Sequence, residues 1–289
     1  MNAVVEQLRP MNRDAVHAGA AAAPKIAFRN VSKLYGGVGR HAKPTLALDS
    51  LDIAIRPAEI VTVLGPTGCG KSSTLNIIAG FEMPSSGVVT LDGKPIEGPG
   101  PDRAVVFQQP SLFPWLNVFD NVTLGVKCRG TPRDQYTARA MHLLGEVGLA
   151  GFEHHYPYQL SGGMQQRVQI CRALVSEPKV LLMDEPFGAL DYQTRISMQE
   201  LLLKLWQEYQ PTIFFITHDV SEAIFVADRV LVMSRRPGRI KVSAQVEAEK
   251  PRDAGFLTAP GFIELQRELL HAVQEEVRAN AGGGGADAH

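Results

Sequence analysis

The sequence has few cysteines, no surplus of charge and no long apolar run. Its 289 residues include three cysteines, Cys69, Cys128 and Cys171, whose spacing fits neither a disulfide framework nor a metal site. A small disulfide-stabilised scaffold is therefore excluded. Free thiols are typical of a reducing compartment, and we interpret all three cysteines as packing residues.

The charges nearly cancel, with 29 Lys and Arg against 30 Asp and Glu. Proteins that hold nucleic acid through overall charge need a basic surplus, because they neutralise phosphates. The sequence thus predicts no nucleic-acid partner. The hydrophobic share of 45% and charged share of 20% are those of a globular protein.

No segment approaches the roughly 18 consecutive apolar residues that a membrane-spanning helix needs. We therefore expect that the chain does not cross a bilayer. The Ala-rich start lacks the charged and then apolar order of a secretory signal, which predicts a cytosolic location. Residues 1–24 and the Gly-rich residues 281–289 are expected to be disordered tails.

The hydrophobic pattern predicts an α/β fold. Alternating segments at 25–34 and 46–55 indicate antiparallel strands joined by a surface loop over 36–44. An apolar strand over 59–64, a glycine loop and a helix over 71–79 follow directly. These segments predict an N-terminal antiparallel β-subdomain leading into the main sheet.

Strands and helices alternate further along the chain. Strands are expected at 104–107, 180–183, 212–217 and 229–233, and helices at 163–176, 195–209 and 220–227. This alternation predicts a mostly parallel sheet with helices on both faces. A helical subdomain is expected over about 109–176, clearest at 136–147. The main domain should span 25–248, and an extension over 249–280 should contain a helix at 262–277.

Residues 65–72, Gly-Pro-Thr-Gly-Cys-Gly-Lys-Ser, fit the phosphate-loop pattern. Its glycines let backbone N–H groups surround phosphate oxygens, and the following helix adds its positive N-terminal end. Lys71 should place its charge on the β- and γ-phosphates, and Ser72 its hydroxyl on a magnesium ion. A glycine loop that binds nothing is the weaker interpretation.

The strand at 180–183 ends in Asp184 and Glu185. In a parallel sheet, such a strand end opens into the ligand crevice beside the phosphate loop. Asp184 then suits magnesium, directly or through water. Glu185 is placed to orient and deprotonate an attacking water. An acidic pair alone more often begins a solvated loop, but the phosphate loop favours the metal and the base.

Residues 160–167, Leu-Ser-Gly-Gly-Met-Gln-Gln-Arg, open a helix and form a second anion-binding helix start, with Ser161 at the cap. With these motifs, the chain resembles the ATPase subunits of ATP-binding cassette (ABC) transporters over about residues 25–248. In that family, this signature closes over ATP held by the partner subunit. The resemblance implies a homodimer in which five residues act in trans: Ser161, Gly162, Gly163, Gln165 and Asp191.

The resemblance also implies the cofactors ATP and Mg²⁺ and assigns further residues. Gln108 would contact magnesium and the attacking water, His218 the γ-phosphate, and Tyr35 the adenine by stacking. Magnesium would be held by Ser72, Gln108 and Asp184. Catalysis would involve Glu185, His218, Gln108 and Lys71. The nucleotide would contact Tyr35, Gly65, Pro66, Thr67, Gly68, Cys69, Gly70, Lys71, Ser72 and Ser73.

Residues near these motifs resemble the nitrate, sulfonate and taurine importer group, namely 98–103, 113–115 and 236–240. Residues 111–115 would help to form the groove that receives two permease subunits, although a hydrophobic plug is the alternative. The resemblance implies a location at the cytoplasmic face of a bacterial inner membrane, and a periplasmic or lipid-anchored solute-binding protein.

Basic residues outside the motifs are interpreted as solvent-facing. Arg235, Arg236 and Arg239 could bind an anion, but we favour a solvated turn. His154 and His155 are expected to face solvent.

Two other functions stay open at this point. A soluble ABC ATPase would usually carry two cassettes or a long coiled coil, neither of which is found in the sequence. A phosphate-loop kinase would not need the complete motif at 160–167.

Overall fold

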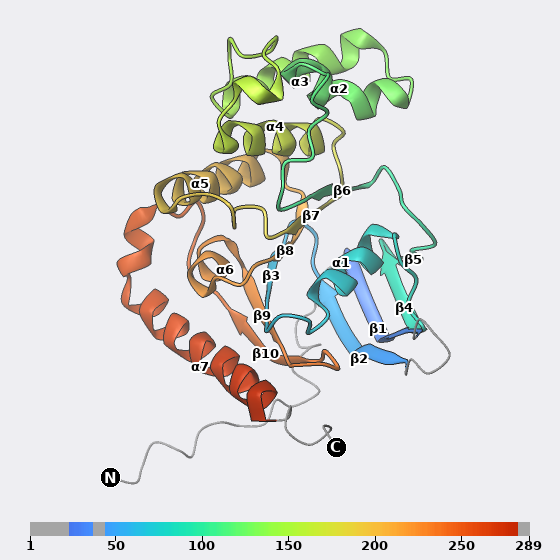
Figure 1. The fold of residues 1–289 in the computed structure, drawn as a ribbon, viewed down its shortest axis with the longest axis vertical. Coiled ribbons are helices and arrows are strands. Elements are labelled where there is room, and N and C mark those ends of the chain that lie inside the picture. Colours follow the sequence, from blue (N-terminus) through green and yellow to red (C-terminus); the bar gives the residue numbers. More distant parts are fainter. Residues whose placement is uncertain (1–22, 37–43, 283–289) are drawn as a thin grey trace.

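The computed structural model describes residues 23–36 and 44–282, with only the backbone of 279–282. Most of the tails expected at 1–24 and 281–289 lies outside these residues, as does most of the loop expected over 36–44. Two sheets and the helices around them make up the described structure (Figure 1).

The larger sheet has six strands in the order β10-β9-β3-β8-β7-β6. The strands from β9 to β6 run parallel, and β10 pairs with β9 in the antiparallel sense. Their bounds are β10 Ile240–Gln245, β9 Arg229–Met233, β3 Ile60–Leu64, β8 Thr212–Ile216, β7 Val180–Asp184 and β6 Arg103–Val106.

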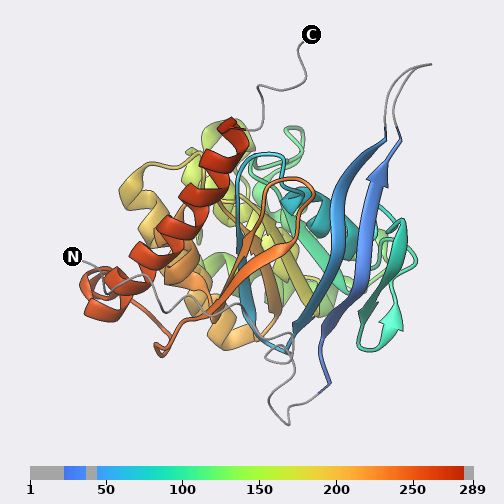
Figure 2. The ribbon, with the colours of Figure 1, turned by 90° about the horizontal axis from the view of Figure 1, so that it is seen from below.

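The smaller sheet is antiparallel, with the order β2-β1-β4-β5. It stands beside the larger sheet in Figure 2. Its strands are β2 Thr45–Ile55, β1 Ile26–Tyr35, β4 Ser86–Leu91 and β5 Lys94–Pro95. The predicted α/β class, with a mostly parallel core and an antiparallel N-terminal β-subdomain, is confirmed.

Helices cover both faces of the larger sheet. Helix α1 (Lys71–Ala79) packs between the two sheets, where Leu75 and Ile78 join a core with Val61, Phe214 and residues of β1 and β2. The opposite face is covered by α4 (Gly162–Leu174), α5 (Tyr192–Tyr209) and α6 (Val220–Val226). Every residue of β3 and β8 is buried, because both faces of these strands are covered.

Three helices, α2 (Val118–Cys128), α3 (Arg133–Glu146) and α4, gather at one end of the molecule (Figure 1). Short 3₁₀ turns lie at Pro157–Gln159 and Ala254–Thr258. The C-terminal helix α7 (Pro260–Gly282) packs against α6 and β9, burying Phe262 and Leu269. None of the helices described has the length and apolarity that crossing a membrane requires.

Several expectations were wrong. Strands β4, β5 and β10 were not predicted. Residues 281 and 282 belong to α7 instead of a tail. Cys69 and Cys171 are buried as expected, but Cys128 is exposed. His155 is only partly exposed, because its ring packs 4.9 Å from that of Phe152.

Candidate functional site

The phosphate loop joins β3 to α1, as the motif predicted. Gly70 precedes the helix with a φ of 103°, and a Cβ there would lie 2.5 Å from Cδ2 of Leu48. Only glycine fits both this backbone conformation and this close approach. No side chain caps the start of α1, so its first N–H groups are free to face a ligand.

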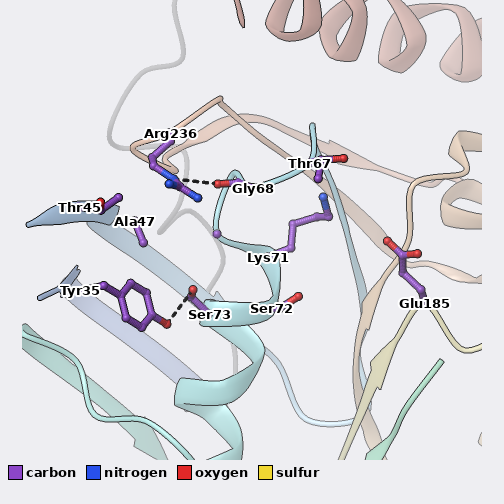
Figure 3. Close-up of a pocket in the computed structure, with 11 residues that line it drawn as sticks. Tyr35, Thr45, Ala47, Thr67, Gly68, Lys71, Ser72, Ser73, Glu185 and Arg236 are labelled. Atoms are coloured by element: carbon purple, nitrogen blue, oxygen red, sulfur yellow. Dashed lines mark hydrogen bonds between the residues drawn. The ribbon is translucent and has the colours of Figure 1, made fainter. Parts of the chain in front are cut away.

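A cavity of about 470 Å³ opens beside this loop (Figure 3). Its walls come from β1, β2, the phosphate loop, the start of α1, the end of β7 and the turn between β9 and β10. The lining residues are Tyr35, Thr45, Ala47, Thr67, Gly68, Gly70, Lys71, Ser72, Ser73, Glu185 and Arg236.

Lys71 is 9% exposed, and its ammonium lies inside the loop. Nζ donates to the carbonyl oxygens of Gly65, at 2.7 Å, and Pro66, at 3.1 Å. The buried Cys69 thiol, 3.9 Å from Nζ, completes this environment. Burial raises the pKa of Cys69, although the nearby charge of Lys71 opposes the rise. The phosphate loop therefore holds the Lys71 ammonium against its own backbone carbonyl oxygens.

Tyr35 closes the cavity at the end of β1. Its hydroxyl donates to Glu82 Oε2 at 2.6 Å and lies 3.0 Å from Ser73 Oγ. Burial and the Glu82 carboxylate raise the pKa of Tyr35, so the hydroxyl stays protonated. These bonds fix the ring against α1, with one face available to a planar ligand.

Asp184, at the end of β7, is hydrogen-bonded to Ser72, which lines the cavity. Burial raises the pKa of Asp184, and the neighbouring Glu185 adds to the rise, whereas a hydrogen bond from Ser72 opposes it. A carboxylate beside a hydroxyl is a donor set that fits Mg²⁺, which prefers oxygen ligands. The described residues thus fit the metal that the sequence predicted.

Glu185 and His218 form a pair at the ends of β7 and β8. Glu185 Oε2 lies 3.1 Å from His218 Nδ1. Gln108, which follows β6, lies nearby: a Cβ on Gly188 would be 3.4 Å from Gln108 Nε2 and 3.9 Å from Glu185 Oε2. Three adjacent strand ends therefore bring an acid, an imidazole and an amide together.

The residues expected to act in trans lie away from this cavity. Ser161 caps α4, and its Oγ accepts from the N–H of Met164 at 3.3 Å. Gly163 packs against Thr194, near the start of α5, which Asp191 caps. Gln165 donates to Pro157 O at 2.9 Å. None of the expected trans residues lines the described cavity.

Three residues that line the cavity, Thr45, Ala47 and Arg236, were not predicted as site residues. Arg236 lies in an exposed turn, as predicted, but its Nε also donates to Gly68 O at 3.1 Å and its side chain lines the cavity. Its basic character was visible in the sequence, but the contact joins positions 168 residues apart. Thr45 and Ala47 carried no signal beyond their place on a strand.

Comparisons with known proteins agree with this geometry. The family model described as ABC transporter matches residues 48–188. An uncharacterized ABC transporter ATP-binding protein of Methanocaldococcus jannaschii is 47% identical over 253 residues, covering 88% of this chain and 92% of that protein. The taurine import ATP-binding protein TauB of Yersinia pestis bv. Antiqua is 50% identical over 252 residues, covering 86% and 97%.

A solved structure supports the same assignment. It is a dimeric ATP-binding cassette in a post-hydrolysis state bound to ADP and Pi, with a TM-score of 0.66 and 32% identity, covering 78% of this chain and 100% of the other. The chain therefore belongs to the ABC transporter family. It is an ATP-binding cassette that couples ATP hydrolysis to transport.

Proposed function

We propose that this chain is the ATPase subunit of an importer for small sulfonates of the taurine class. The ATPase part rests on one observation above all: Lys71, Ser72 and Glu185 line a single cavity. The importer and its solute class rest on similarity to the taurine import ATP-binding protein. The alternative of a soluble, non-transport ABC ATPase finds no support in these relatives.

Within the cavity, Tyr35 stacks on adenine, and the phosphate loop with Ser73 binds the triphosphate. Lys71 leaves the carbonyls of Gly65 and Pro66 to neutralise the β- and γ-phosphates. Ser72, Asp184 and Gln108 would hold Mg²⁺, which would supply charge stabilisation to the transferring phosphoryl group when bound.

Hydrolysis depends on the residues at the strand ends. Glu185 orients a water molecule and accepts its proton, and His218 donates a hydrogen bond to the terminal phosphate. The 3.1 Å contact between these side chains supports this division of roles, because the imidazole restrains the carboxylate. Catalysis is then mainly positioning and charge stabilisation.

The active form is a homodimer. Ser161, the glycines after it and Gln165 lie at a helix start away from the chain's own cavity, where Ser161 is exposed. A second copy arranged head to tail would bring this helix start, with Asp191, onto the nucleotide of its neighbour. ATP binding then closes the dimer, and hydrolysis reopens it.

Two permease subunits dock at residues 111–115. Trp115 is 70% exposed, and its ring packs 5.5 Å from Phe113, which Arg172 covers on another side. An exposed tryptophan beside a partly buried phenylalanine supports a contact with an apolar partner segment. The chain would thus work at the cytoplasmic face of a bacterial inner membrane, with a separate solute-binding protein delivering the solute.

Reconstitution tests this proposal. The chain would be co-purified with candidate permease subunits and a candidate solute-binding protein from the same genome and placed in proteoliposomes. Taurine should stimulate ATP hydrolysis and should accumulate inside the vesicles only when ATP is present. A complex that carries Glu185→Gln should neither hydrolyse ATP nor accumulate taurine. Stimulation by an unrelated solute alone would contradict the sulfonate class, and hydrolysis without any transport would contradict the importer.

A further inference from the structure

The turn between β9 and β10, residues 234–239, forms a wall of the nucleotide cavity. Arg236 Nε donates to Gly68 O at 3.1 Å, and a Cβ on Gly68 would lie 3.3 Å from Arg236 Nη2. The guanidinium therefore lies directly over the phosphate loop. Figure 3 shows it on the side of the loop where Thr45 and Ala47 also lie, away from Glu185.

The backbone of this turn is fixed against the loop. Gly238 N–H donates to Ala47 O at 2.8 Å, and Asp49 N–H donates to Gly238 O at 3.1 Å. A Cβ on Gly238 would lie 2.1 Å from Cys69 O, which leaves no room for any other residue type. The turn, β2 and the phosphate loop consequently hold one another in place.

Helix α7 supports the turn from outside. Glu276 Oε2 accepts a hydrogen bond from the Arg235 backbone N–H at 2.9 Å. Glu276 also pairs with Lys241 of β10 at 2.8 Å, as does its neighbour Glu275. Of these two acids, only Glu276 has a described hydrogen bond to the turn. It therefore links α7 to Arg235, the residue before Arg236.

The charges along the cavity favour an anion at Arg236. Lys71, Glu185 and Arg236 are the charged side chains that line it. Lys71 and Glu185 lie toward the end where the γ-phosphate is expected, and Arg236 lies toward the Tyr35 end (Figure 3). An exposed guanidinium there can donate to a phosphate while Nε stays on Gly68.

We propose that Arg236 binds the α-phosphate end of the nucleotide, and that Glu276 of α7 is a positioning residue that holds the Arg236 turn in place. This inference rests on the proposed nucleotide site. It gives the C-terminal helix a role in nucleotide affinity. Because the α-phosphate is common to ATP and ADP, the contact strengthens the binding of both nucleotides and leaves the hydrolytic step alone.

Nucleotide titrations of the purified full chain test the first part. With Arg236→Ala, dissociation constants for ADP and for a non-hydrolysable ATP analogue should both rise about tenfold, which corresponds to about 1.4 kcal/mol. KM for ATP should rise alongside, with kcat unchanged. Arg129→Gln, a change at an exposed arginine of the helical region, should alter neither constant.

Conservative variants separate charge from loop support. Arg236→Lys keeps a cation and should restore most of the affinity, whereas Arg236→Gln keeps an N–H donor for Gly68 O but should bind as weakly as Arg236→Ala. Equal recovery of affinity in Arg236→Lys and Arg236→Gln would overturn the phosphate contact. Wild-type affinity in Arg236→Ala would also overturn it, as would an affinity loss that affects the ATP analogue but not ADP. Failure of the wild-type chain to bind either nucleotide would instead refute the proposed function.

Adjacent acids on α7 test the second part. Glu276→Ala should raise both dissociation constants several-fold. Glu275→Ala removes contacts with Lys241 and His271 but no hydrogen bond to the turn, so it should not. If α7 acts through Arg236, Glu276→Ala should have no further effect in the Arg236→Ala background. Additive effects, or equal effects of the two acids, would overturn the positioning role.

Discussion

Glu185 Oε2 and His218 Nδ1 lie 3.1 Å apart although the two residues are separated by 33 positions in sequence. The sheet produces this contact. Strands β7 and β8 run parallel with Asp184 opposite Ile216, so the residues that follow these strands emerge side by side. The Glu185 N–H also donates to Ile216 O at 2.9 Å, which fixes the backbone at the point where the acid leaves the sheet.

Glu185→Gln should abolish hydrolysis while preserving nucleotide binding. The amide keeps the size of the side chain but cannot accept a proton from water, and general-base catalysis contributes about 10²- to 10⁴-fold in rate. ATP should therefore trap the variant as a dimer. Steady-state phosphate release and size-exclusion chromatography with ATP measure both effects.

A second glutamate–histidine pair provides the control. Glu208 Oε1 lies 2.9 Å from His142 Nε2 on the surface of α5 and α3, away from the cavity. Glu208→Gln should hydrolyse ATP at the wild-type rate. A normal rate in Glu185→Gln, or loss of ATP binding there, would count against the proposed base.

The trans arrangement predicts complementation between damaged subunits. Lys71→Ala and Ser161→Ala should each inactivate a homodimer, because each removes a component of both composite sites. A mixed dimer with one change in each chain should recover up to half the wild-type rate, since one site keeps both residues. Placing both changes in the same chain of a mixed dimer leaves neither site intact and serves as the control. Absence of any recovery would show that Ser161 does not act across the dimer.

Trp115→Ala should uncouple hydrolysis from transport. Trp115 is 70% exposed, so its removal should cost the isolated chain little stability and no ATP binding. Assembly with the permease, measured by co-purification, should fall. Ile263→Ala, which changes an exposed apolar side chain on α7, should co-purify normally. Normal assembly of the Trp115 variant would argue against docking at 111–115.

Thiol alkylation should begin at Cys128. Cys128 is exposed, whereas Cys69 and Cys171 are buried and burial raises the pKa of both thiols. Since the thiolate is the reactive form, the buried cysteines should react far more slowly near pH 8. Peptide mass spectrometry over a time course measures the order. Alkylation of Cys69 as fast as Cys128 would contradict the buried position of the thiol.

Glu222 should make stability depend on pH. Burial raises the pKa of its carboxyl, although hydrogen bonds from Thr217 and Gln199 oppose the rise. The folded state then binds the proton more tightly than the unfolded state, so stability falls as pH rises above the ordinary carboxyl range. Relative to wild type, Glu222→Gln should gain thermal stability between about pH 5 and about pH 8. A difference in melting temperature that is the same at both pH values would contradict this.

The sequence could predict those elements whose pattern is local. Strand β3, the phosphate loop and α1 are consecutive, and the fully buried β3 has a nearly continuous apolar sequence. Strand β10 was missed because its residues are only partly buried, and β4 because it begins with exposed Ser86 and Gly87. Strand β4 forms through pairing with the distant β1, and β10 is an edge strand that pairs with β9 alone, so local hydrophobicity does not reveal either of them.

The same limit applies to the site. The motifs predicted the residues that line the γ-phosphate end, but Arg236 reaches Gly68 through a turn that only the folded sheet brings near. Residues expected to act in trans could not come from reasoning on one chain, because a partner surface leaves no periodic signal. They entered through resemblance to a family.

The burial of α1 between two sheets has a consequence for how the nucleotide is bound. Thr74, Leu75, Ile77 and Ile78 are each at most 1% exposed, so the amide protons of this helix should exchange with solvent only when the whole core opens. The phosphate cradle is therefore ordered before its ligand arrives. Nucleotide binding then costs little conformational entropy at the loop. More of the binding free energy is therefore available for closing one subunit against another.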